Sequence, residues 1–385
     1  MKPGYKQTEV GVIPEDWLVK PIGKVAPLQR GFDLPARNIR PGPFPIVYSN
    51  GIDGFHNVAM ARGPGVVTGR SGTLGMIHYV KEDYWPHNTS LWVTRFNENV
   101  PKFIYYLYQA VRFQRFASGS GVPTLNRNDA HSHPIALPSN PAEQRAIAAA
   151  LSDVDALLGG LDRLIAKKRD LKQAAMQQLL TGQTRLPGFS GAWEVKRLGD
   201  VVDTDPEALS GNTKPGFTFK YIALEDVDRG VLRGFSDQQF ATAPSRARRT
   251  LRLDDVLVST VRPNLQSHLL FRAEGSDWVC STGFCVVRCR ADVTHPAYVF
   301  FHLFAHPVSR QIEALLTGSN YPAINSGDVR ALEIPLPDFV EQTAIAAVLS
   351  DMDAELNALE ARRDKTRDLK QAMMQELLTG KTRLV

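Results

Sequence analysis

The most regular pattern of apolar positions in the chain lies between Glu143 and Leu186. Apolar residues recur there at alternating spacings of four and three, which is the spacing of a coiled-coil seam. The seam positions are Ile147, Leu151, Val154, Leu158 and Leu161. This pattern predicts one long amphipathic helix of about 40 residues, roughly 60 Å at ~1.5 Å per residue.

The same segment occurs a second time, between Glu341 and Leu384. The two copies align without a gap and share 29 of 44 residues. The second seam consists of Ile345, Leu349, Met352, Leu356 and Leu359. Both copies then become charged, at 162–168 and 360–366, after which four leucines are expected to restore the apolar face: Leu171, Leu179, Leu369 and Leu377. Two matching seams in one chain can pair with each other, and the stretch of chain between them allows an antiparallel pairing.

Capping residues mark the ends of both predicted helices. Asn140 stands before Pro141, and Asp338 holds the same place in the second copy, so each helix has a side chain suited to its N-terminus. Gly182 and Gly380 stand where a left-handed residue ends a helix. The helices therefore fill most of 140–185 and 338–385.

The regions before the two helices also resemble each other. Both open with a glycine a few residues before a tryptophan, Gly11 before Trp17 and Gly188 before Trp193. Both end near a Pro-x-x-Asn motif, whose last residue is Asn126 or Asn325. Short β-branched runs at 65–68, 76–80, 217–224 and 256–260 predict strands, and 102–116 and 297–316 predict helices. We predict an α+β fold in which two similar domains, 1–139 and 186–337, are separated by two long, antiparallel coiled-coil helices.

Composition sets outer limits on the function. No apolar run approaches the 18 residues of a membrane span, and the first residues lack the apolar core of a signal peptide, so we expect a cytoplasmic protein. The three cysteines, Cys280, Cys285 and Cys289, lack the paired spacing of a metal site and are expected to be reduced core residues.

Positive charge is unevenly distributed. Residues 1–140 hold 15 basic and 9 acidic side chains, whereas residues 187–338 hold 16 and 18. Within the second region, four arginines nevertheless cluster between Arg246 and Arg252. Such a cluster can neutralise phosphates, although it is more often a solvated surface.

A search for catalytic motifs finds none that is complete. Gly380-Lys381-Thr382 resembles the end of a phosphate-binding loop, but it ends a helix instead of opening one. Glu194-Val-Lys196 lacks a partnering aspartate at nuclease spacing, and His302 and His306 lack the glutamate of a zinc protease. We therefore predict a chain that is not itself an enzyme.

Two similar domains, a duplicated helix and no catalytic motif together resemble the DNA-specificity subunit of type I restriction-modification enzymes. The resemblance covers essentially the whole chain, and the Glu-Gln-x-x-Ile-Ala-x-x-Leu-Ser-Asp-x-Asp segments at 143–155 and 341–353 carry it most specifically. It implies that each domain is a target recognition domain for one half of an interrupted DNA site. It also implies that the helices set the gap and dock two modification subunits, which use S-adenosylmethionine to methylate adenine at N6. Restriction subunits that need ATP and Mg would complete the enzyme, and no cofactor is expected in this chain.

Loops that follow strands are the natural places for residues that contact DNA bases. We nominate Arg70, Ser71 and Thr73 in the first domain, and Arg262, Asn264 and Gln266 in the second. Arg246, Arg248 and Arg249 are assigned to phosphates. The alternative function is a stand-alone two-headed DNA-binding scaffold or repressor that acts without a methyltransferase partner.

Overall fold

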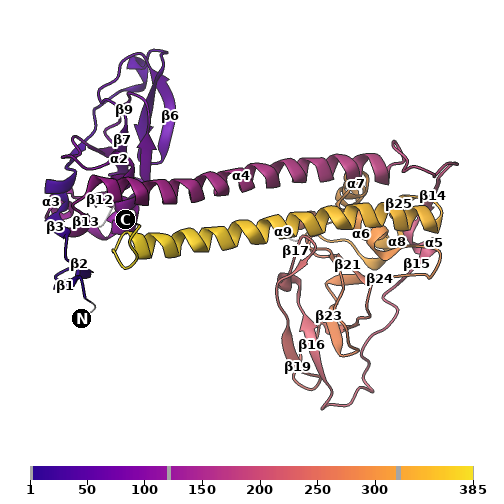
Figure 1. Ribbon diagram of the computed structural model, residues 1–385. Helices are drawn as coiled ribbons and strands as arrows, with labels where there is room; N and C mark the ends of the chain where they lie inside the picture. The colour runs from indigo at the N-terminus through magenta and orange to yellow at the C-terminus, as the bar shows by residue number, and fades with distance from the viewer. Residues whose placement is uncertain (1–2, 119–122, 318–321, 385) are drawn as a thin grey trace. The chain divides into compact units, whose positions relative to one another are not determined.

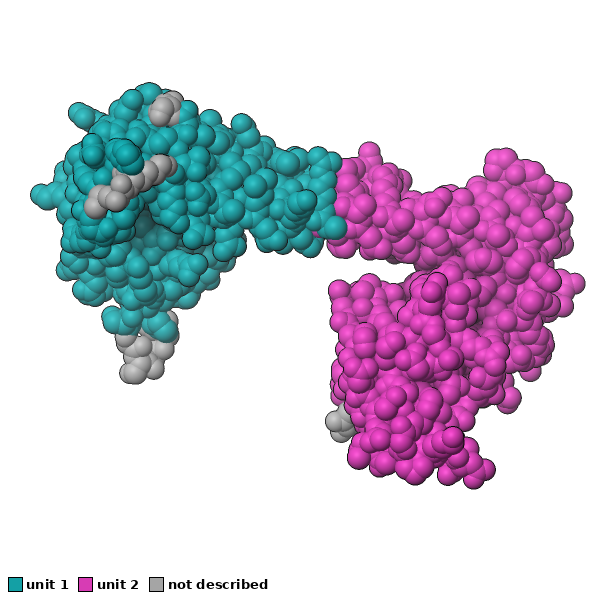
Figure 2. Space-filling model, turned by 60° about the horizontal axis from the view of Figure 1, so that its bottom comes forward, with its two compact units in different colours: residues 1–163, 361–385 teal, residues 164–360 magenta. Residues whose placement is uncertain are grey.

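The computed structural model describes residues 3–118, 123–317 and 322–384. These residues form two compact units, one of 1–163 with 361–385 and one of 164–360 (Figure 2). Each unit contains one recognition domain and parts of both repeated helices (Figure 1).

The repeated segments form the two longest helices, α4 (Pro141–Leu180) and α9 (Phe339–Leu377) (Figure 1). The Asn140 side chain accepts a hydrogen bond from the Ala142 N–H, and Asp338 does the same for Glu341. Gly182 and Gly380 adopt φ angles of 70° and 72° just beyond the two helices, where residues other than glycine are strained. The predicted caps and stops are confirmed.

The predicted seam residues lie between α4 and α9. Ile147, Leu151, Ile345 and Leu349 are at most 1% exposed, and the remaining seam residues are buried or half-buried. In the first unit the start of α4 packs against the end of α9, where Lys370 pairs with Asp155 at 2.7 Å. In the second unit the end of α4 packs against the start of α9, and Lys168 pairs with Glu355 at 2.7 Å. The two helices are therefore antiparallel in both units.

Of the four leucines expected to restore the apolar face, Leu179 and Leu377 are buried, at 6% and 4% exposed, whereas the other two do not lie in the seam. Leu171 is 47% exposed and Leu369 is 55% exposed. A straight α-helix drifts by about 20° per heptad relative to a 3.5-residue repeat, so one spacing rule does not follow the buried face along 40 residues. Ile165, at 2% exposed, and the half-buried Met176 continue the buried side of α4 instead.

The first recognition domain combines a four-stranded antiparallel sheet, ordered β4-β10-β7-β8, with a three-stranded sheet, ordered β6-β5-β9. A third pair, β13 with β3, lies next to the start of α4 in sequence. The helix α2 packs on the larger sheet and buries Phe103, Tyr106 and Tyr108. The elements are β1 (Tyr5–Thr8), β2 (Gly11–Pro14), β3 (Trp17–Pro21), α1 (Ile22–Val25), β4 (Leu28–Arg30), η1 (Ala36–Asn38), β5 (Phe44–Tyr48), β6 (Gly51–His56), β7 (Gly65–Gly69), β8 (Ile77–Val80), β9 (Trp85–Pro86), β10 (Ser90–Val93), α2 (Pro101–Val111), η2 (Phe113–Phe116), β11 (Ala117–Ser118), β12 (Thr124–Leu125), α3 (Arg127–Ser132) and β13 (Pro134–Pro138).

The second recognition domain repeats this plan. Its sheets are ordered β15-β24-β21-β22 and β19-β16-β23-β20, and β14 pairs with β25 as β3 does with β13. In both domains a parallel pair, β5 with β9 or β16 with β23, lies in the second sheet. The elements are β14 (Glu194–Arg197), α5 (Leu198–Val201), β15 (Val202–Thr204), β16 (Thr218–Ile222), η3 (Leu224–Asp226), β17 (Val227–Asp228), β18 (Val231–Leu232), β19 (Ser236–Gln239), β20 (Ala247–Thr250), β21 (Val256–Ser259), η4 (Pro263–Leu265), β22 (Leu269–Leu270), β23 (Trp278–Ser281), β24 (Phe284–Cys289), α6 (Pro296–Phe304), α7 (His306–Leu315), α8 (Ser326–Ala331) and β25 (Glu333–Leu336).

The α+β prediction is confirmed, with one correction to its helices. The stretch 297–316 contains two helices, because Ala305 is extended, with φ −76° and ψ 140°, and α7 begins next to Pro307. Proline has no N–H to donate and cannot continue α6. The stretch 102–116 likewise divides into α2 and a short 3-10 turn at the left-handed residue Arg112.

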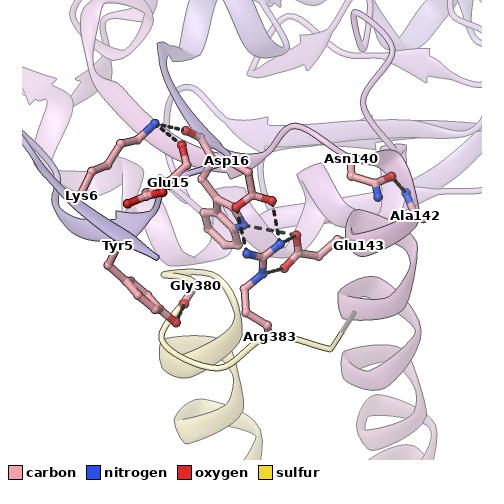
Figure 3. Close-up of polar contacts among 10 residues, drawn as sticks. Tyr5, Lys6, Glu15, Asp16, Asn140, Ala142, Glu143, Gly380 and Arg383 are labelled. Carbon is pink, nitrogen blue, oxygen red and sulfur yellow. Dashed lines mark hydrogen bonds and ion pairs between the residues drawn. The ribbon is translucent and has the colours of Figure 1, made fainter. Parts of the chain in front are cut away.

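A buried carboxylate joins each recognition domain to the helix that follows it. Glu143, in the first turn of α4, is 0% exposed and accepts hydrogen bonds from Trp17 Nε1 at 3.3 Å and from Arg383 at 2.5 and 2.8 Å (Figure 3). Arg383 also donates to both oxygens of Asp16, at 2.9 and 2.8 Å, and these hydrogen bonds lower the pKa of Asp16. The segment that follows α9 is thereby fastened to the domain that precedes α4.

The second unit contains the matching arrangement. Glu341 is also 0% exposed and accepts from Trp193 Nε1 at 3.1 Å and from Arg185 at 2.5 Å. Arg185 donates in addition to the Gly191 carbonyl at 2.6 Å, because Ala192 stands where the first unit has Asp16. We call these two arrangements the Glu143 clamp and the Glu341 clamp.

Candidate nucleic-acid interface

The nominated loop of the first domain begins where β7 ends. The Arg70 N–H donates to the Thr89 carbonyl at 2.8 Å, and the Arg70 carbonyl accepts from the Leu125 N–H at 2.8 Å. A β-bridge joins Ser71 to Thr124. The end of β7 is therefore held beside the segment that leads into α3, and Thr73, at the tip of the loop, is exposed.

These two segments surround a concavity with a volume of about 490 Å3. Three arginines lie around it, one from β4, one from the nominated loop and one from the first turn of α3. The lining residues are Arg30, Arg70, Leu91, Ser118, Thr124, Leu125, Asn126, Arg127 and Asn128. The nominated Arg70 therefore belongs to a basic concave surface that includes two arginines the sequence analysis did not select.

The electrostatic surroundings of these arginines affect nearby titratable groups. Asp33 pairs with Arg30 at 2.9 Å, and its pKa is lowered, first by a hydrogen bond from Asn88 and then by that guanidinium. Burial and the charge of Arg127 lower the pKa of His131. His131 is therefore neutral at pH 7 and accepts a hydrogen bond from the Leu28 N–H at 2.8 Å, which places β4 against α3.

The second domain has an equivalent loop after β21. The Thr260 N–H donates to the Gly283 carbonyl at 2.9 Å, the Thr260 carbonyl accepts from Ile324 at 2.9 Å, and a β-bridge joins Val261 to Ala323. The two loops are therefore equivalent, and Arg70 corresponds to Thr260 and not to the nominated Arg262. The second loop continues beyond this point into a 3-10 turn.

The three nominated residues of the second loop flank that turn. Arg262 and Gln266 adopt left-handed φ angles of 49° and 58° on either side of η4. Arg262 and Asn264 are exposed, and Gln266 donates to Ser309 Oγ at 3.4 Å. Left-handed residues other than glycine are strained and are often found at functional sites. Whether these side chains read bases stays a prediction.

The arginine cluster lies on β20 and just before it, at the edge of its sheet. Arg246 is exposed, and the Arg248 guanidinium lies 5.0 Å from the Phe240 ring centroid. Arg249 is only 18% exposed and pairs with Asp205 at 2.8 Å. The assignment of Arg246 and Arg248 to phosphates stays a prediction, whereas Arg249 is already engaged inside the domain.

The sequence could have indicated the two missed arginines. Arg127 directly follows Asn126, which caps α3 and closes the repeated Pro-x-x-Asn motif. Arg30 ends β4, whose pairing with β10 brings it opposite Leu91. The first could have been found from the motif alone, whereas the second needed the strand pairing.

Other functional sites are not evident in the described residues. No group of three or more histidine, cysteine, aspartate or glutamate side chains there is placed to hold a metal ion. His302 is buried in α6 beside Tyr298, as expected of a core histidine. None of the described helices has the length and apolar character needed to cross a membrane.

The sequence matches the family model described as "Type I restriction modification DNA specificity domain" twice, at residues 14–166 and 191–366. A Methanocaldococcus jannaschii protein described as the specificity subunit of the type I restriction enzyme MjaX is 23% identical over 99% of this chain and 97% of its own length. The MjaVIII specificity subunit of the same organism is 22% identical over 69% of this chain and 66% of its own length.

Solved structures show the same fold. The S subunit of a type I restriction-modification system from M. genitalium superposes with a TM-score of 0.65 and 16% identity, covering 98% of this chain and 99% of that one. A chain from a study of complex assembly and conformational transition in the type I system has a TM-score of 0.54 and 19% identity, with 96% and 99% covered. The two family matches together span most of the chain, which therefore belongs to the type I restriction-modification DNA specificity family, the non-catalytic recognition components of these systems.

Proposed function

We propose that each recognition domain of this specificity subunit reads one half of an interrupted DNA site. The observation that carries this proposal is the repetition of one surface, a strand-end loop held beside a short helix, in both domains. Loops at strand ends present side chains that reach base edges, and two-domain readers couple the spacing of half-sites to the distance between their modules.

The repeated helices are proposed to set the gap and to dock two modification subunits. Methylation of adenine at N6 requires the base to leave the stack and enter a pocket. In this proposal that pocket, with S-adenosylmethionine, belongs to the modification subunit, and ATP and Mg act on restriction subunits. The absence of complete catalytic motifs in the sequence supports this division of labour.

The test is co-purification of the chain with the products of its neighbouring genes, followed by sequencing of methylated adenines. We expect methylated adenines in one interrupted sequence when the partners are present. The chain alone is expected neither to bind S-adenosylmethionine nor to transfer methyl groups. Methyl transfer by the isolated chain would exclude the proposed role of an adaptor.

The alternative, a stand-alone two-headed DNA-binding scaffold or repressor, makes a different prediction. It expects sequence-specific binding that does not depend on any partner and leaves DNA unmethylated. Binding assays with and without the co-purified partners on the same duplex distinguish the two functions. The family membership favours the specificity subunit.

A further inference from the structure

We propose that the first recognition domain carries a phosphate-binding surface for DNA that is not repeated at the equivalent place among the described residues of the second domain. The surface consists of Arg30, Arg70 and Arg127 around the concavity described above. We call it the three-arginine surface. The inference rests on the proposed binding of DNA by both domains, and it adds that their contacts to the DNA backbone are unequal.

The three arginines come from separate elements that the fold brings together. Arg30 ends β4, Arg70 follows β7 and Arg127 begins α3. Arg30 pairs with Asp33, but the two side chains are 51% and 67% exposed, so solvent weakens that pair. Neither Arg70 nor Arg127 forms an ion pair with any residue that the structure describes. Such a group of guanidinium groups around a concavity attracts an anion.

Backbone pairing identifies the residues that occupy these places in the second domain. Thr260 makes the same two backbone hydrogen bonds as Arg70. Ser326 follows the capping residue Asn325 of α8, as Arg127 follows Asn126 of α3. Leu28 pairs with Val93 in the first domain, and Thr204 pairs with Val287 at the equivalent place in the second. Arg30 and Pro206 each stand two residues further along the chain and are therefore equivalent. All three equivalents are uncharged.

The same alignment places an acid on the second domain. Asp205 stands where the first domain has Gln29. Its carboxylate accepts from Ser326 Oγ at 2.6 Å and from the Val286 N–H at 2.8 Å, and it pairs with Arg249. The second domain therefore uses this place to join its own strands and helix.

Two largely buried arginines of the second domain also pair with nearby acids. Arg249 pairs with Asp205, and Arg288 pairs with Asp255 and Glu207. An arginine that already pairs with a carboxylate releases fewer DNA counterions when it contacts a phosphate. The net charges have the same direction, since residues 1–140 hold 15 basic and 9 acidic side chains whereas residues 187–338 hold 16 and 18.

Phosphate contact and base contact have different signatures. Each phosphate that a protein neutralises contributes about 0.9 to the slope of log affinity against log salt concentration, irrespective of sequence. An arginine that reads guanine instead contributes about 1–3 kcal/mol of discrimination at one base pair. Lysine can replace arginine as a point charge at a phosphate, but it does not reproduce the paired hydrogen bonds of a guanidinium.

The experiment measures binding of the full chain, with its partners where they co-purify, to a fluorescent duplex between 50 and 200 mM NaCl. We expect Arg70→Gln and Arg127→Gln each to reduce the slope of log affinity against log salt concentration by about 0.9. Between 50 and 200 mM NaCl, the affinity of each variant should therefore fall by a factor about 3.5 times smaller than that of the wild type. Arg127→Lys should retain the slope of the wild type, which also shows that a change in the glutamine variant is not due to misfolding.

Two controls test the location of the effect. Arg95→Gln removes an exposed arginine just beyond the other end of β10, and Ser326→Ala changes the second-domain equivalent of Arg127. Both should leave the slope unchanged. An equal loss of slope in Arg95→Gln would overturn the proposal, and so would an unchanged slope in Arg127→Gln with relaxed specificity at one base pair. If the wild-type complex itself bound no duplex, the proposed function would fail together with this inference.

Discussion

Glu143 and Glu341 are each placed by the local preference for an acid at a helix N-terminus, and each also binds an arginine far away in the sequence. Both stand in the first turn of a helix, where the helix dipole favours an acidic side chain. In the structure both are fully buried, and each binds an arginine from the end of the other repeat. No local pattern could indicate this, because Glu143 and Arg383 are 240 residues apart.

Removal of Arg383 should destabilise the first unit. Arg383→Gln leaves the carboxylate of Glu143 buried without its cation, and breaking a buried ion pair from one side costs about 3 kcal/mol or more. The double variant Arg383→Gln with Glu143→Gln should recover part of this loss, because no buried charge then remains unpaired. Chemical denaturation of the full chain measures both, and equal stability of wild type and Arg383→Gln would contradict the expected role of the clamp.

Two buried histidines should make the second recognition domain sensitive to acid. Burial lowers the pKa of His268 to about 4 and that of His302 to about 3, from 6.5. As the pH falls, the unfolded chain therefore protonates these histidines before the folded chain does. The free energy of unfolding is unaffected by them above pH 6.5 and decreases as the pH drops towards 4. Each histidine should cost up to about 1.4 kcal/mol per pH unit in this window.

Urea denaturation at pH 7.5, 6 and 5 checks this dependence. His302→Phe, which keeps a ring beside Tyr298, should show a smaller decrease between pH 6 and 5 than the wild type. The exposed His306 provides a matched control, because His306→Phe should leave the pH dependence unchanged. A decrease of the same size in all three proteins would exclude the buried histidines as its cause.

At the scale of elements, the repeated helices were the most predictable part of the molecule. Caps, stops and seam positions followed from spacing alone, because each depends on residues within a few positions along the chain. The course of the seam beyond residue 165 followed only in part, since Leu179 and Leu377 are buried whereas Leu171 and Leu369 face solvent. The loop register also escaped prediction, because backbone pairing and not motif similarity aligns Arg70 with Thr260.

If the helices are the spacer, their length should set the gap in the DNA site. Insertion of seven residues in 162–168, matched by seven in 360–366, adds two turns and keeps the seam in phase. Each helix lengthens by ~10 Å, so at ~3.4 Å per base pair the gap should grow by at most roughly three base pairs.

A matched pair of three-residue insertions provides the control, because it rotates the seam out of register and should impair function. Sequencing of methylated adenines in both variants measures the gap. An unchanged gap in the seven-residue variant would mean that the helices serve as a docking surface and not as the spacer.

At the scale of the whole molecule, duplication explains why the fold could be predicted while the site could not. Both domains follow one plan, with equivalent strand orders in the sheets β4-β10-β7-β8 and β15-β24-β21-β22. The side chains on those loops differ, as Ser71 and its equivalent Val261 show. Repeated motifs reveal the fold that the two domains share. The residues that would give the two domains different DNA sequences to bind are the ones that differ between the repeats, so the repeats do not reveal them.

Exchange of residues 1–138 for the recognition domain of another family member should therefore change one half-site only. The other half-site and the gap should persist, because the second domain and both helices are retained. Mapping of methylated sites in the hybrid measures this, and a change in both halves would show that the domains do not read independently. The exchange should keep Asp16 and Trp17, so that the Glu143 clamp can form.

The Glu143 clamp also has a consequence for how the chain is made. Synthesis proceeds from the N-terminus, so Glu143 leaves the ribosome 240 residues ahead of the arginine that neutralises it. The second unit consists of one continuous stretch, 164–360, whereas the first also requires 361–385. The first unit therefore begins synthesis before the second unit but is completed after it. Until residues 361–385 have been synthesised, the carboxylate of Glu143 has no arginine to pair with.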